Sequence, residues 1–134
     1  MQSLLIGVLV LHVLAAVFWA GSTFALVRIG GDGGERLFAP QMGAAVVAFL
    51  SGVVLWGLLH RGPPGVPEVL LEIGAVCAVA AAGVQGALIG GARRKLAAGG
   101  EAADGARRRI ATAQRIAAGL LAVTIILMSA VRYV

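Results

Sequence analysis

The fold class is set by a stretch near the N-terminus that holds no charged side chain other than a histidine. Residues 4–27 read LLIGVLVLHVLAAVFWAGSTFALV. At a rise of about 1.5 Å per residue, a helix of this length crosses the roughly 30 Å hydrocarbon core of a bilayer. The stretch is long, is interrupted by His12 and has no basic start, so we expect a retained span and not a cleaved signal peptide.

Three further apolar stretches follow, over residues 42–59, 69–89 and 116–131. The chain of 134 residues is 60% hydrophobic and 13% charged, with a mean hydropathy of +0.96, which indicates an integral membrane protein. No segment alternates over about ten residues, as a membrane barrel would require. The sequence therefore predicts an all-α chain, an antiparallel four-helix bundle that forms a single domain over residues 1–134.

The connections between these stretches differ in length and charge. GGDGGERLFAP, which ends at Pro40, and RGPPGVP predict two short links, whereas GGARRKLAAGGEAADGARRR predicts a longer polar one. Nine of the 11 lysines and arginines lie in or beside the first and third links, and only Arg61 and Arg132 lie at the opposite end. By the positive-inside rule, both termini are expected to be non-cytoplasmic. The composition suits a bacterial inner (cytoplasmic) membrane.

The sequence pI near 11.1 does not indicate a nucleic-acid partner. The basic residues cluster at the ends of spans without interleaved aromatic residues, so topology and anionic lipid headgroups account for them. The expected partner is the lipid bilayer.

Small residues recur at every fourth position of the third apolar stretch. They are Gly74, Ala78, Ala82, Gly86 and Gly90. Such a stripe lets a second helix backbone approach closely, which favours helix association in lipid. Two interpretations stay open: contacts within one chain, or a seam with a second copy or a larger membrane complex. Ala44, Ala48 and Gly52 form a similar stripe in the second stretch.

Three potential metal ligands fall at comparable depth in the non-cytoplasmic half. His12 lies roughly 12 to 14 Å inside its span, Cys77 lies at a similar depth, and Met128 lies nearer the surface. An ionisable residue inside a span indicates a ligand or proton-handling role. The alternative for His12 is a neutral imidazole hydrogen-bonded across the bundle to a hydroxyl or a carbonyl.

Other polar and aromatic residues have simpler interpretations. His60, beside Arg61 at a helix C-terminus, is expected to be an interfacial cap. Glu68 and Glu72 lie one turn apart near a helix N-terminus, where the helix dipole favours carboxylates. Trp56 is expected to pack or to lie at the membrane interface.

The first span resembles a known pattern. His12, Trp19 and Gly21 form an H-x6-W-x-G run that resembles the copper-resistance protein D family, and it is also similar to the first helix of HemJ-type membrane protoporphyrinogen oxidases. The closing run MSAVRYV, residues 128–134, is similar to the end of copper-resistance D-like domains. The resemblance implies a four-helix bundle with His12 in a metal or haem role, and it places Trp19 and Arg28 beside a cofactor.

Three alternative functions are therefore considered, in order of preference. The first is binding or movement of copper, or a similar soft metal, by His12, Met128 and Cys77, because copper prefers imidazole and sulfur ligands. The second is a haem b redox protein with His12 as axial ligand, alone, with Met128, or paired across two protomers. The third is an accessory or structural subunit. No catalytic residue is assigned, and any enzymatic activity would be that of a haem-dependent oxidoreductase.

Overall fold

Four long helices make up most of the chain. The computed structural model describes residues 1–60 and 62–134. Its elements are α1 (Gln2–Arg28), α2 (Gly34–Leu59), α3 (Val66–Ala98), α4 (Gly100–Ala130) and the 3-10 turn η1 (Val131–Tyr133). Each of the four helices is long and apolar enough to cross a membrane. The predictions of an all-α chain and of four apolar helices are confirmed.

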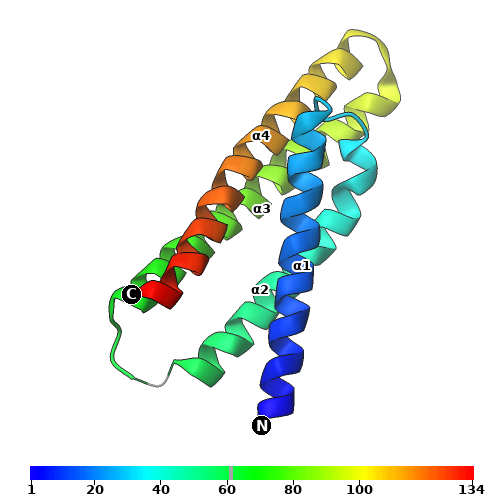
Figure 1. Cartoon of the computed structure of the whole chain (residues 1–134). Coiled ribbons are helices and arrows are strands. Elements are labelled where there is room, and N and C mark those ends of the chain that lie inside the picture. Colours follow the sequence, from blue (N-terminus) through cyan, green and yellow to red (C-terminus); the bar gives the residue numbers. More distant parts are fainter. Residues whose placement is uncertain (61) are drawn as a thin grey trace.

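The helices associate in two pairs, α1 with α2 and α3 with α4 (Figure 1). The pairs meet where α1 contacts α4 and where α2 contacts α3, whereas the backbones of α1 and α3 do not approach each other. The N-terminus and the C-terminus lie apart at the same end of the molecule (Figure 1). Residues on α1 and α3 therefore meet only where a long side chain reaches across the centre.

The first connection is shorter than the sequence predicts. α2 begins at Gly34, so Pro40 lies inside the helix instead of closing a turn before it. The reversal is made by Gly30, Gly31 and Gly33, whose φ angles of 74°, 85° and 75° belong to the left-handed region. Pro40 is the seventh residue of α2, beyond the first turn, so its missing N–H leaves the carbonyl of Arg36 without an intrahelical donor.

The prediction of a longer polar third connection is wrong. α3 continues to Ala98 and α4 begins at Gly100, so only Gly99 separates them, and both glycines have φ near +70° (73° and 67°). The two extensions pack along an apolar seam. Its buried residues are Ile89, Ala92, Ala106, Ile110 and Ala113. The stretch is therefore a helical hairpin with an apolar seam and a charged outer face.

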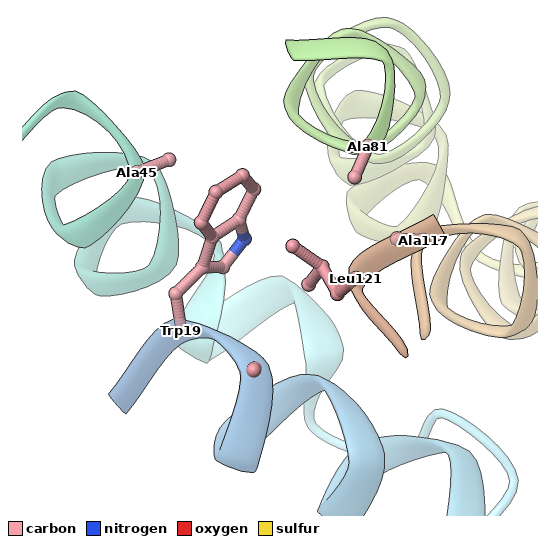
Figure 2. Close-up of a cluster of buried hydrophobic side chains, with 6 residues drawn as sticks. Trp19, Ala45, Ala81, Ala117 and Leu121 are labelled. Carbon is pink, nitrogen blue, oxygen red and sulfur yellow. The ribbon is translucent and has the colours of Figure 1, made fainter. Parts of the chain in front are cut away.

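Small side chains fill the core of the four-helix region. Trp19 packs among alanines and a leucine contributed by the other three helices (Figure 2). These neighbours are Ala45 on α2, Ala81 on α3, and Ala117 and Leu121 on α4, and Ala20 of α1 completes the cluster. Large aliphatic side chains point outwards instead, for example Val76 and Ile126, which are 68% and 65% exposed. An outer surface of large aliphatic side chains is suited to contact with lipid hydrocarbon, while the small residues lie where the helices pack together.

Most of the small-residue stripe of α3 is used within the chain. Gly74 lies against α4, where the Thr124 hydroxyl donates to its carbonyl at 3.0 Å, and Gly90 lies against Phe38 of α2. Ala78 and Ala82 pack on the core around Trp19. A Cβ atom at Gly86 would meet nothing within 4 Å. Contacts within one chain thus account for four of the five positions, and a homo-oligomer seam stays a prediction.

Candidate functional site

His12 lies on the face of α1 that packs against α2. Its Nδ1 atom is 2.8 Å from the carbonyl oxygen of Ala48 and 3.1 Å from the hydroxyl oxygen of Ser51. A carbonyl oxygen only accepts hydrogen bonds, so Nδ1 carries the proton. The Ser51 hydroxyl donates to the carbonyl of Val47 at 2.6 Å, which leaves a lone pair for His12. In the neutral ring, Nε2 therefore holds the free lone pair.

The second span provides the space for this imidazole. A Cβ atom at Gly52 would lie 3.2 Å from Cε1 of His12, so a larger residue would press on the ring. The alternative interpretation of His12, an imidazole hydrogen-bonded across helices to a hydroxyl or a carbonyl, is confirmed for Nδ1, which has a partner of each kind. Within residues 1–60 and 62–134, no protein group is hydrogen-bonded to Nε2. Nδ1 thus fixes the orientation of the ring, and Nε2 remains free to bind a ligand.

The other two residues of the expected copper site lie on the second helix pair. Met128 packs beside Gly74, with its Cγ 3.5 Å from the position of a Cβ atom there. Cys77 is a free, half-buried thiol on α3. Among the residues that the structure describes, no group of three or more His, Cys, Asp or Glu side chains could hold a metal ion. The site composed of His12, Met128 and Cys77 stays a prediction.

Of the two further residues assigned to a cofactor, one is buried and one is exposed. Trp19 is 4% exposed, and its indole N–H donates to Oε1 of Gln85 at 2.7 Å. Its polar atom is therefore already paired between the helices. Arg28 is the exposed last residue of α1, where a cation suits the helix dipole.

A buried ring of three glutamines and a threonine, not predicted from the sequence, joins all four helices. Gln85 on α3 donates to Thr23 on α1 at 3.1 Å and to Gln114 on α4 at 3.0 Å. Gln114 donates to Gln41 on α2 at 3.2 Å. Gln41 donates to Thr23 and to Ser22, each at 3.1 Å, which closes the ring. Thr23 and the three glutamines are 0% exposed. We call these four residues the amide ring.

The amide ring is a structural feature, not a proton-transfer site. Each of its glutamine oxygens already accepts a hydrogen bond, and none of its side chains ionises at ordinary pH. The sequence feature that could have revealed the amide ring is the presence of a single glutamine within each of the last three helices. Buried amides require partners, so glutamines on three packed helices predict mutual hydrogen bonds.

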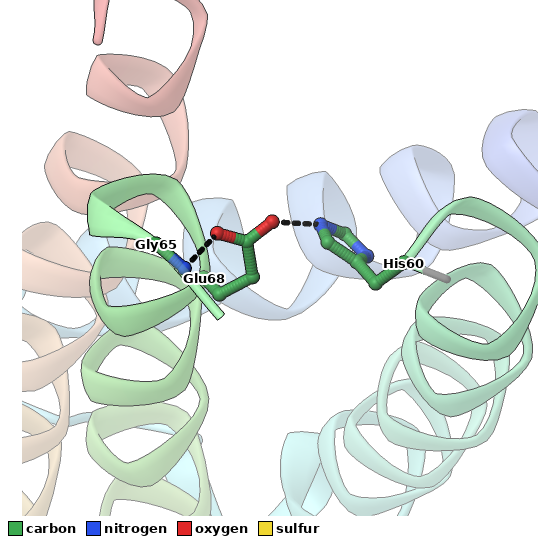
Figure 3. A network of polar contacts seen from close by, with 3 residues as sticks. All are labelled: His60, Gly65 and Glu68. Atoms are coloured by element: carbon green, nitrogen blue, oxygen red, sulfur yellow. Dashed lines mark hydrogen bonds and ion pairs between the residues drawn. The ribbon is translucent and has the colours of Figure 1, made fainter. Parts of the chain in front are cut away.

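At the end of the molecule that carries the termini, His60 bridges α2 and α3 (Figure 3). Its Nε2 lies 3.9 Å from Oε1 of Glu68, and its ring stacks on Trp56 with centroids 4.4 Å apart. Oε2 of Glu68 accepts the N–H of Gly65 at 2.8 Å. Glu68 therefore caps the first turn of α3, as expected of a carboxylate there. Arg61, expected beside His60 at this interface, lies outside the described residues.

No family model, no curated protein and no solved structure matches this chain. The surroundings of His12 are therefore the basis for a functional proposal.

Proposed function

We propose that this chain is a membrane protein that binds copper, or a similar soft metal, through Nε2 of His12. One observation carries the proposal: Nδ1 of His12 donates to the Ala48 carbonyl at 2.8 Å, while Nε2 has no protein partner in the described part of the chain. Histidines that bind metals commonly donate their second ring N–H to a carbonyl, which fixes the tautomer and orients the ring. The contact between α1 and α2 supplies this orientation for His12.

The proposal includes a placement in the membrane. The four helices cross the bacterial inner membrane as an antiparallel bundle, with both termini on the non-cytoplasmic side. The uneven distribution of lysine and arginine supports this orientation. His12 then lies in the non-cytoplasmic half of the bilayer, the side from which the metal is proposed to enter. Met128, on the helix α4 that contacts α1, is the sulfur ligand proposed to complete the site, and the short side chain of Cys77 would join it only if α3 moved closer to α1.

Metal analysis of the purified protein tests the assignment. Protein loaded with Cu(I) is expected to retain about one copper per chain after desalting, and His12→Ala to lose it. His60→Ala is the matched control, because it removes the other histidine and should keep the metal. An equal copper content per chain in the wild type and in His12→Ala would contradict the proposal. A Soret band after expression with added haem, lost in His12→Ala, would assign the histidine to haem instead.

The hydroxyl that supports the ring gives a second test. Ser51→Ala removes one of the two acceptors at Nδ1 and leaves the Ala48 carbonyl in place, so we expect metal affinity to fall about tenfold without loss of binding. Competition with a Cu(I) chelator measures the change, and Ser3→Ala, on the exposed N-terminal turn, is the control. An unchanged affinity would show that Ser51 does not position the imidazole.

A further inference from the structure

α1 and α4 share a buried contact in only one half of the molecule. Trp19 of α1 and Leu121 of α4 are 4% and 3% exposed and belong to the same buried cluster. One turn further along α4, Ile125 is 45% exposed, and the first buried residue of α1 is Ala15. Figure 1 shows the same change, because α1 and α4 separate towards the end that carries both termini. We call this end of the bundle, which contains residues 1–14, the open half.

Each helix pair stays packed within the open half. Nδ1 of His12 on α1 donates to the Ala48 carbonyl of α2 at 2.8 Å. On the other pair, Thr124 of α4 donates to the Gly74 carbonyl of α3 at 3.0 Å, and Met128 packs beside the same glycine. The separation in the open half therefore lies between α1 and α4, not within either pair.

Two contacts between the pairs limit how the open half can move. The amide ring joins all four helices on the side of Trp19 that faces away from the termini. Near the termini, His60 of α2 lies 3.9 Å from Glu68 of α3 (Figure 3). α2 and α3 are thus held together at both ends of the open half. The movement that these contacts allow is an approach of α1 to α4.

His12 and Met128 lie at matching positions on α1 and α4. His12 precedes Trp19 by seven residues, and Met128 follows Leu121 by seven. Seven residues are close to two helical turns, so each residue lies on the same face as its reference residue, about 10 Å along the helix. Because Trp19 and Leu121 pack in one cluster, these two faces point towards each other. An approach of α1 to α4 therefore brings His12 and Met128 together.

We propose that one soft metal ion, bound by His12 and Met128 together, draws α1 to α4 and closes the open half. The inference rests on the proposed function, because the ion must first bind Nε2 of His12. With the helices apart, Nε2 holds the ion; with the helices together, the thioether of Met128 holds it as well, and soft ions accept both ligands. A ligand shifts an equilibrium by its difference in affinity for the two states, so the second bond stabilises the closed form.

Distances between spin labels test the closure in the detergent-purified full chain. Nitroxides attached through p-acetylphenylalanine at the exposed positions of Leu4 and Ile126 leave Cys77 unmodified. On addition of Cu(I), which is diamagnetic, the distance is expected to shorten by about 3 to 6 Å, because packed helices lie only about 8 to 10 Å apart. Labels at Val79 and Val123, within the α3–α4 pair, are the control and should keep their distance.

Replacement of the thioether separates closure from binding by His12. Met128→Leu nearly conserves the volume of the side chain, so we expect the fold to be retained. It should lower Cu(I) affinity at least about tenfold and abolish the shortening, since loss of a ligand should cost no less than loss of a residue that orients one. Met42→Leu makes the same exchange beside the cluster around Trp19, and this matched control should change neither quantity.

The closure and the metal assignment fail in different ways. A wild type that retains copper without a shortened distance between positions 4 and 126 would overturn the closure and leave the assignment of His12 intact. A wild type that retains no copper would overturn both. Shortening that persists in Met128→Leu would exclude Met128 as the second ligand, and the inference would be wrong.

Discussion

Gln85→Ala is expected to lower the free energy of unfolding by about 3 kcal/mol. The side chain is 0% exposed and has hydrogen bonds to Trp19, Thr23 and Gln114. Alanine would leave the indole N–H of Trp19 without its acceptor and Gln114 without its donor, around a cavity. Single hydrogen bonds between membrane helices contribute only about 0.6 kcal/mol on average. The larger figure arises because one substitution removes three bonds and the volume of the side chain together.

Unfolding of the detergent-solubilised protein by heat or by sodium dodecyl sulfate, followed by circular dichroism, measures this loss. Gln2→Ala is the matched control, because it removes the same amide from an exposed position on the first turn of α1 and should be nearly neutral. If Gln85→Ala were as stable as Gln2→Ala, the amide ring would not hold the two helix pairs together.

Gly31→Ala is expected to destabilise the fold by roughly 3 kcal/mol, for two separate reasons. The φ angle of +85° disfavours any residue with a side chain. In addition, a Cβ atom would lie 2.9 Å from Cα of Ala111, so the backbone of α4 would have to move. Backbone has less freedom to adjust than the end of a side chain, and the α1–α2 turn would be pushed away from α4.

A substitution at the neighbouring Gly30 separates the cost of the positive φ angle from the cost of the contact with α4. Gly30 has φ +74°, and a Cβ atom there would meet nothing within 4 Å. Gly30→Ala should therefore cost only the backbone term, about 1 kcal/mol. Unfolding midpoints of the two variants, compared under the same conditions, give the difference directly. Equal midpoints would mean that the turn does not press on α4.

The four apolar helices were predictable because length and polarity alone define them. Residues 4–27 exclude charge over a distance that matches the bilayer, and this requires no knowledge of neighbouring helices. The α3–α4 hairpin beyond the third span could not be predicted, because its many charged residues mask the hydrophobic pattern of the buried seam. Three of its five buried residues are Ala92, Ala106 and Ala113, and small residues among arginines give little hydrophobic signal even where they are buried.

The candidate site was predictable only in part. His12 is conspicuous as an ionisable residue within an apolar span, and the sequence correctly allowed a carbonyl or a hydroxyl as its partner. The acceptor itself could not be named, because a backbone carbonyl such as that of Ala48 carries no sequence signature. It becomes visible only when the pairing of α1 with α2 is known. The same holds for Gln41, Gln85 and Gln114, whose side chains find one another through tertiary structure.

The amide ring also fixes how far each helix is inserted relative to the others. Apolar contacts between alanines tolerate sliding, since one small residue replaces another after a turn. A helix that slipped by one turn would move its amide about 5.4 Å along the axis, beyond hydrogen-bonding distance of its neighbours. Because all four helices contribute one member, a single vertical alignment satisfies every amide at once. The amide ring thereby selects one axial register of the four helices among the several that alanine contacts alone would allow.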